Sequence, residues 1–104
     1  MNAIRIKRGG ALSLGFQFSD DDGGFADLTG IAVASQVRDA NDALVATLPV
    51  MVEPAIGAAS VLVADTSAWP VGRLRCDVML TTIEGLSVFS ETFSIHVDLQ
   101  VTRP

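Results

Sequence analysis

RLRCDVML, residues 73–80, alternates apolar and polar side chains with a period of two. The apolar phase holds Leu74, Cys76, Val78 and Leu80, and the other phase holds Arg73, Arg75, Asp77 and Met79. Successive side chains of a β-strand point to opposite faces of the sheet. This stretch therefore predicts a strand with one face in a core and the other in water.

The same alternation recurs in residues 11–19, 31–38 and 92–99. The side chains expected to point inward there are Leu12, Leu14, Phe16, Phe18, Ile31, Val33, Val37, Phe93, Ile95, Val97 and Leu99. Shorter strands are predicted around Ile4 and Ile6, over 43–48, in the segment that ends at Glu53, and over 60–64. Pro49 places the two middle ones at a sheet edge or a bend, because proline cannot donate to a ladder of hydrogen bonds. No segment has a long 3.6-residue period, so we expect almost no α-helix.

Turn-forming residues separate these strands at 8–10, 20–24, 39–42, 54–57 and 84–85. Their spacing of roughly 10–15 residues is typical of an all-β sandwich or barrel. Residues 65–70 predict one short helical turn near 66–69, which Asp65 or Thr66 caps and Pro70 ends. About seven strands, each with one apolar face, must pack against a second sheet. The prediction is an immunoglobulin-like antiparallel β-sandwich, with a closed or half-open barrel as the alternative and Trp69 plugging one end of the core.

The length and composition of the chain predict a single folded domain. The chain has 104 residues, the size of one domain, so we expect a single domain over residues 1–104. Hydrophobic residues make up 49% and charged residues 18%, which favours a folded chain over a disordered one. No apolar run reaches the roughly 18 residues of a membrane span, and the start of the chain lacks the apolar block of a secretion signal. We therefore expect synthesis in the cytoplasm and no membrane insertion.

The charge of the chain argues against a nucleic-acid partner. Twelve acidic and seven basic residues give a formal charge of −5, which leaves no broad cationic face for a phosphate backbone. Arg5, Lys7 and Arg8 form the only basic cluster of the sequence, and a solvated terminal strand accounts for it.

The sequence assembles no catalytic or cofactor site. Catalysis by a serine or cysteine nucleophile generally needs a base, and the sole histidine, His96, lies on the solvent-facing side of a predicted strand. The sole cysteine, Cys76, has the inward phase of Leu74 and Val78, which predicts a buried core residue rather than a reactive thiol. A lone cysteine also excludes an internal disulfide and a cysteine-based zinc site. We therefore expect no catalytic or cofactor-binding residues and no enzymatic activity.

An acidic loop is the one candidate for metal binding. Asp20, Asp21 and Asp22 precede Gly23-Gly24, and Asp27 follows. Calcium loops place acids at alternate positions and end in a bidentate glutamate, whereas three consecutive carboxylates cannot all point at one ion. A solvated turn without metal is the favoured interpretation, and calcium binding is the alternative.

The segment from Ala43 to Glu53 is apolar, flat and poor in charge. An uncovered edge strand is a template for another chain, so this segment predicts self-assembly or strand addition to a partner. The alternative is that a loop or the terminal strand covers the edge.

Several short signatures, read in order, span nearly the whole chain. They are Lys7-Arg8-Gly9, the strand from Leu12 to Phe18, Ala26-Asp27-Leu28-Thr29-Gly30, Gln36-Val37-Arg38, Val61-Leu62-Val63-Ala64-Asp65-Thr66, Trp69-Pro70-Val71-Gly72, Cys76-Asp77-Val78, Phe93-Ser94-Ile95-His96-Val97 and Val101-Thr102-Arg103. Together they resemble a family of small phage and prophage proteins that look like the amino-terminal domain of the baseplate upper protein of tailed phages. The resemblance implies an immunoglobulin-like sandwich in a tail, baseplate or head-associated protein that is made in the bacterial cytoplasm, and no enzyme. A baseplate organiser is expected to carry a longer carboxy-terminal portion than follows the domain here.

Two hypotheses for function follow. The first is a non-enzymatic structural or assembly protein of a tailed bacteriophage or prophage, located in the virion, whose partners are other virion proteins and further copies of itself. The alternative is a carbohydrate- or cell-surface-binding module. Such modules usually stack sugars on exposed aromatic rings, but the chain has no tyrosine and one tryptophan, and its five phenylalanines mostly belong to the predicted core.

Overall fold

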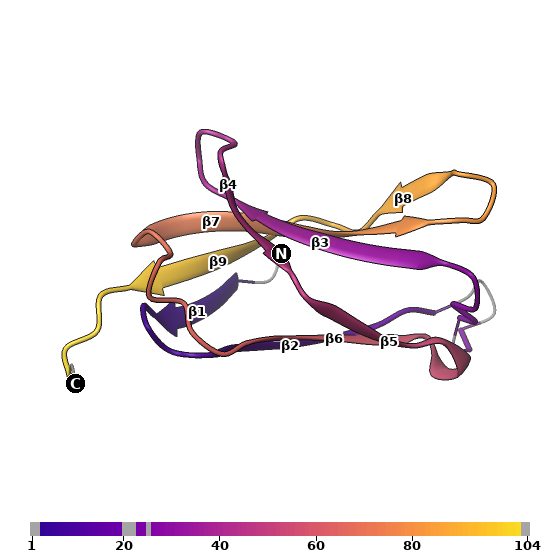
Figure 1. The fold of residues 1–104 in the computed structure, drawn as a ribbon, viewed down its shortest axis with the longest axis horizontal. Helices are drawn as coiled ribbons and strands as arrows, with labels where there is room; N and C mark the ends of the chain where they lie inside the picture. Colours follow the sequence, from indigo (N-terminus) through magenta and orange to yellow (C-terminus); the bar gives the residue numbers. More distant parts are fainter. Residues whose placement is uncertain (1–2, 20–22, 25, 103–104) are drawn as a thin grey trace.

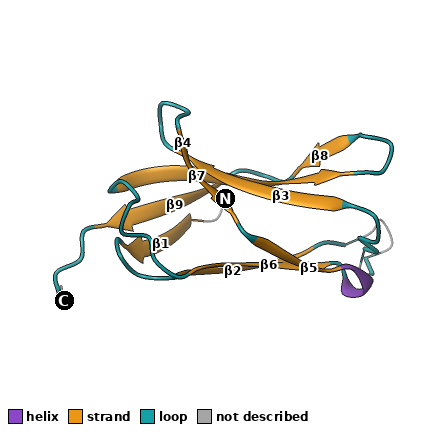
Figure 2. Ribbon diagram, in the orientation of Figure 1, coloured by secondary structure: helices purple, strands orange, loops and turns teal. Residues whose placement is uncertain are grey.

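The computed structural model describes residues 3–19, 23–24 and 26–102, which form two β-sheets stacked face to face (Figure 1). The strands are β1 (Ala3–Lys7), β2 (Leu12–Gln17), β3 (Ala32–Arg38), β4 (Leu44–Leu48), β5 (Val50–Glu53), β6 (Ala58–Val63), β7 (Gly72–Thr81), β8 (Ser87–Phe89) and β9 (Phe93–Asp98). The larger sheet has the order β1-β9-β7-β3-β4, with β8 added to β7, and the smaller sheet has the order β2-β6-β5. Strands and loops make up almost all of the described chain (Figure 2). The predicted all-β sandwich is confirmed.

The alternating stretches supply the core between the two sheets. Leu74, Cys76 and Val78 of β7 are buried, as the period-two pattern predicts. Leu74 and Cys76 pack in one cluster with Leu12 and Val61 from the smaller sheet. Burying one such aliphatic side chain contributes about 1.5–3 kcal/mol relative to leaving it exposed. The core therefore holds the two sheets together mainly through hydrophobic burial.

The crossing between the sheets occurs at Pro49. β4 pairs with β3 in the larger sheet, and β5, one residue further along the chain, pairs with β6 in the smaller sheet. Proline has no N–H to donate, so it fits the single residue at which the chain leaves one ladder for the other. The predicted edge or bend at this residue is confirmed.

Thr66 ties the loop before Trp69 to the turn between β1 and β2. Its Oγ1 accepts a hydrogen bond from the Gly9 N–H at 3.1 Å and donates one to the Gly10 carbonyl at 2.7 Å. The Trp69 N–H then donates to the Thr66 carbonyl at 3.0 Å, and the indole is buried. Trp69 therefore belongs to the core, as predicted.

Three details differ from the sequence-based expectation. The segment near 66–69 forms a single hydrogen-bonded turn, whereas the one 3₁₀ turn described spans Pro54–Ile56, where only a loop was expected. The β1–β9 pair is parallel, while the other strand pairs described are antiparallel. The strand β8 was not predicted, because its three residues are too short to show a clear alternation.

Candidate functional site

Cys76 is a core residue. Its thiol is buried and lies 3.3 Å from the hydroxyl oxygen of Ser35. Burial raises the pKa of the Cys76 thiol, because the thiolate would lose its hydration. The neutral thiol is therefore the form that the fold stabilises, and the prediction of a buried core cysteine is confirmed.

We expect the Cys76 thiol to react with a maleimide at least about tenfold more slowly in the folded protein than in the denatured chain. A raised pKa in the folded state also means that the unfolded chain loses its thiol proton first as the pH rises. The free energy of unfolding should therefore fall on moving into the alkaline range, and Cys76→Ser should lessen that fall. Equal labelling rates in native buffer and in denaturant would contradict a buried thiol.

His96 lies on the outer face of the larger sheet, as predicted, but it is half-buried rather than fully solvated. The strand register places it directly between Arg5 of β1 and Arg73 of β7. No cysteine or serine nucleophile stands opposite it on either neighbouring strand. His96 therefore lies between two basic side chains.

The acidic loop is only partly described, since Asp20, Asp21 and Asp22 lie outside the described residues. Asp27 accepts hydrogen bonds at Oδ1 from the N–H and the hydroxyl of Thr29, at 2.9 and 2.6 Å. These bonds hold the pKa of the Asp27 carboxyl below its usual value. The Asp27 carboxylate is thus engaged in closing a local turn.

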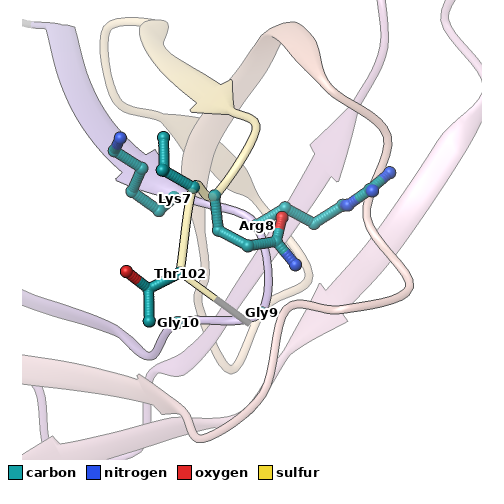
Figure 3. Close-up of a pocket in the computed structure, with 7 residues that line it drawn as sticks. Lys7, Arg8, Gly9, Gly10 and Thr102 are labelled. Carbon is teal, nitrogen blue, oxygen red and sulfur yellow. The ribbon is translucent and has the colours of Figure 1, made fainter. Parts of the chain in front are cut away.

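The surface pockets do not assemble catalytic groups. A pocket of about 460 Å³ lies between the β1–β2 turn and the segment after β9 (Figure 3), lined by Lys7, Arg8, Gly9, Gly10, Gln100, Val101 and Thr102. The side chains of Lys7 and Arg8 diverge from it in opposite directions (Figure 3). Among the described residues, no three histidine, cysteine or acidic side chains are placed to hold a metal ion. Nor does any helix in that part of the chain have the length and apolarity needed to cross a membrane.

The segment from Ala43 to Glu53 forms an edge of both sheets. β4 ends the order of the larger sheet and β5 ends that of the smaller one. Leu44 and Met51 are exposed on these strands. Within the described chain no further strand covers either edge, so the structure supports the open edge over the covered one.

A hairpin arm is the most exposed apolar feature. The long strand β7 continues past the start of β9 and turns back through β8, which pairs with β7 on the side opposite β3 (Figure 1). Its exposed apolar residues are Ile83 (84% exposed), Leu86 (66%), Val88 (59%) and Phe89 (61%), which we call the apolar arm. Among the described strands β8 pairs only with β7. The sequence contained a signal for this arm, because Leu86-Ser87-Val88-Phe89 follows the turn residues Glu84-Gly85.

A basic face is the second feature that the sequence did not reveal. Arg5, Lys7, Arg38, Arg73 and Arg75 lie on the outer face of the larger sheet, on strands β1, β3 and β7. They are five of the seven lysines and arginines of the chain. The expectation of a single basic cluster at the start of the chain was therefore wrong, because strand pairing brings residues far apart in sequence onto one surface.

The comparisons support the fold. The chain resembles a solved structure named GspB Siglec domain, with a TM-score of 0.57 and 16% sequence identity. The match covers 98% of this chain and 56% of that chain, so the chain spans little more than half of the structure it matches. No family model and no curated protein matches the sequence. This likeness supports an immunoglobulin-like β-sandwich fold.

Proposed function

We propose that this chain is a non-enzymatic assembly module of a tailed bacteriophage or prophage particle that acts through protein–protein contacts. The observation that carries the proposal is the apolar arm, where four large apolar side chains, Ile83, Leu86, Val88 and Phe89, are each more than half exposed. A concentration of large exposed apolar side chains is typical of a surface that another macromolecule covers. The arm presents them at an edge of the larger sheet rather than in a cleft, which suits docking to a protein surface.

The arm gains stability from being covered. The strand β8 is a three-residue edge strand that has β7 as its sole described partner, while β7 pairs with β3 on its other side at Met79–Thr81. An exposed edge strand is a template for another chain. A partner that packs against the arm would bury apolar area at about 25 cal/mol per Å². The partner is another virion protein or a second copy of the chain.

The phage assignment is supported by the resemblance of the sequence signatures. The signatures fall at structurally meaningful positions, since Thr66 and Trp69 anchor one end of the core and Cys76 and Val78 lie inside it. They therefore mark residues that define this sandwich. The location of the chain in a virion rests on the resemblance and needs a direct experiment.

That experiment is to purify phage particles from an induced culture of the host and to look for peptides of this chain by mass spectrometry. We expect the chain in the particles. We also expect Ile83→Ser/Phe89→Ser to lower its incorporated fraction at least about tenfold, because both changes remove exposed apolar side chains of the arm. The matched control is Leu62→Ser/Val101→Ser, which changes two other exposed apolar residues.

Two results would overturn the proposal. One is the absence of the chain from purified particles. The other is equal incorporation of the arm variant and the control variant. Circular dichroism of both variants checks that the sandwich itself has formed.

The second candidate function is carbohydrate binding, which the similarity to the GspB Siglec domain favours. The name Siglec denotes a sialic-acid-binding domain, and this chain shares the fold over 98% of its length. Trp69 is 5% exposed and offers no platform for a sugar, so Phe89 is the large aromatic side chain that stands exposed in the described chain. A glycan array tests this candidate, and an array without any signal for the purified protein would rule it out.

A further inference from the structure

Three side chains form a continuous row across the outer face of the larger sheet. Arg5 lies opposite His96 in the β1–β9 pair, and Arg73 lies opposite His96 in the β7–β9 pair. We call Arg5, His96 and Arg73 the basic row. Adjacent strands are about 4.8 Å apart, so the two arginines at its ends leave their strands roughly 10 Å from each other.

Arg73 is held so that part of its guanidinium can bind a ligand. Its Nε donates a hydrogen bond to the hydroxyl oxygen of Ser94 at 3.0 Å, and Ser94 is buried. Among the described residues no carboxylate forms an ion pair with Arg73. The two terminal nitrogens are therefore left without a charged partner, and a planar guanidinium is suited to grip a carboxylate through two parallel hydrogen bonds.

Arg5 completes the other end of the row. Its Nη1 lies 3.5 Å from Asp98 Oδ2, and both side chains are about half or more exposed, at 69% and 49%. An ion pair this exposed is worth little, because water and salt screen it. A ligand carboxylate can therefore share Arg5 with Asp98 at small cost.

The other arginines of the face show the contrast. Arg38 and Arg75 lie directly opposite each other, an arrangement that like charges disfavour. Arg38 donates to the Asp42 carbonyl and to Gln36 Oε1, and Arg75 pairs with the Asp42 carboxylate at 3.1 Å. Groups within the fold therefore bind the guanidinium groups of Arg38 and Arg75, whereas in the described part of the chain the guanidinium of Arg73 has only the neutral hydroxyl of Ser94 as a side-chain partner.

We propose that the basic row binds carboxylate groups of an acidic carbohydrate, with Arg73 as the anchoring residue and Arg5 and His96 beside it. The proposal deepens the second candidate function by naming the ligand class and the site, and it does not depend on the apolar arm. Separated carboxylates on a sugar chain fit a row of discrete hydrogen-bond donors about 10 Å long.

Nucleic acid fits this face less well. Asp77 and Asp98 stand on the same outer face of the strands, and the whole chain carries a formal charge of −5. A phosphate backbone presents closely spaced charges and requires a correspondingly dense array of cations. The basic row offers isolated donors between carboxylates, which suits a ligand of lower charge density.

The test is calorimetric titration of the folded protein with an oligomer of galacturonate, with 3′-sialyllactose, and with the methyl-esterified galacturonate oligomer as the uncharged match. We expect saturable binding of at least one acidic sugar and at least about tenfold weaker binding of the ester, because esterification removes the charge-assisted hydrogen bonds. Arg73→Gln should weaken acidic-sugar binding at least about tenfold, and Arg38→Gln, the control on the same face, less than about twofold. Arg73→Lys keeps the positive charge but loses the planar guanidinium that makes two parallel hydrogen bonds. Its affinity for the acidic sugar should therefore lie between those of the wild type and Arg73→Gln.

Several outcomes would overturn the proposal. They are the absence of binding to both acidic sugars, equal affinity for the acid and its ester, equal losses in Arg73→Gln and Arg38→Gln, or tighter binding of a single-stranded oligonucleotide than of the acidic sugars. Neutral glycans that bind the wild type and Arg73→Gln equally on an array would leave carbohydrate binding standing and show that the basic row is not its site.

Discussion

Replacing Trp69 with alanine is expected to lower the free energy of unfolding by about 3–5 kcal/mol, the range found when large aromatic side chains are deleted from cores. Trp69 is 5% exposed and packs in the same cluster as Leu12 and Leu74, which come from opposite sheets. Alanine would leave a cavity where the two sheets meet, and the loop carrying Trp69 is too firmly tied through Thr66 to collapse into it.

Urea unfolding followed by circular dichroism measures this loss for Trp69→Ala. Val71→Ala is the control, because Val71 follows two residues later and is half exposed; its loss should stay within about 0.5 kcal/mol. The loss in the free energy of unfolding for Trp69→Phe should lie between those two values, since the phenyl ring retains part of the contact area. A loss below about 1 kcal/mol for Trp69→Ala would show that the indole is not part of the core.

Gly57→Ala is the second substitution with a large expected effect, a loss of about 2–5 kcal/mol. Gly57 has φ +63°, a left-handed conformation that costs a residue with a Cβ about 1–2 kcal/mol. A Cβ there would also press on the carbonyl oxygens of Phe18 and Ala26, which are backbone atoms and cannot rotate away. Overpacking of this kind adds about 1–3 kcal/mol.

The surroundings of Gly57 explain why that space is closed. The Phe18 N–H donates to the Gly57 carbonyl at 2.8 Å, and the Ala26 N–H donates to the Phe18 carbonyl at 3.0 Å. Gly15→Ala is the matched control, because a Cβ at Gly15 meets nothing within 4 Å. We expect Gly15→Ala to be neutral or slightly stabilising in thermal unfolding. Equal melting temperatures for the two variants would contradict the tight packing at Gly57.

Local patterns were sufficient to predict most of the strands. The alternation in residues 73–80 corresponds to β7, with Leu74, Cys76 and Val78 inward, and Pro49 marks the change of sheet between β4 and β5. These features depend on residues that are neighbours in the sequence. The parallel pairing of β1 with β9 depends on the ends of the described chain coming together, which no local pattern encodes.

The surface features were harder to predict for the same reason. The basic row joins Arg5, Arg73 and His96, which are separated by tens of residues and meet only through strand register. The sequence showed Arg5 in the basic cluster with Lys7 and Arg8, and it showed Arg73 and His96 only as polar positions on separate strands. The apolar arm was missed because exposed apolar residues on a short strand look, in sequence, like residues that belong in a core. Burial is a property of the folded chain, and three strand residues are too few to reveal it by alternation.

Amide hydrogen exchange of the chain, free and assembled in phage particles, is the measurement that tests the interaction surface most directly. We predict that amides of residues 82–89 exchange quickly in the free protein and become protected in the particle, because a partner covers Ile83, Leu86, Val88 and Phe89. Unchanged exchange in residues 82–89, with new protection confined to other parts of the chain, would contradict docking through the apolar arm.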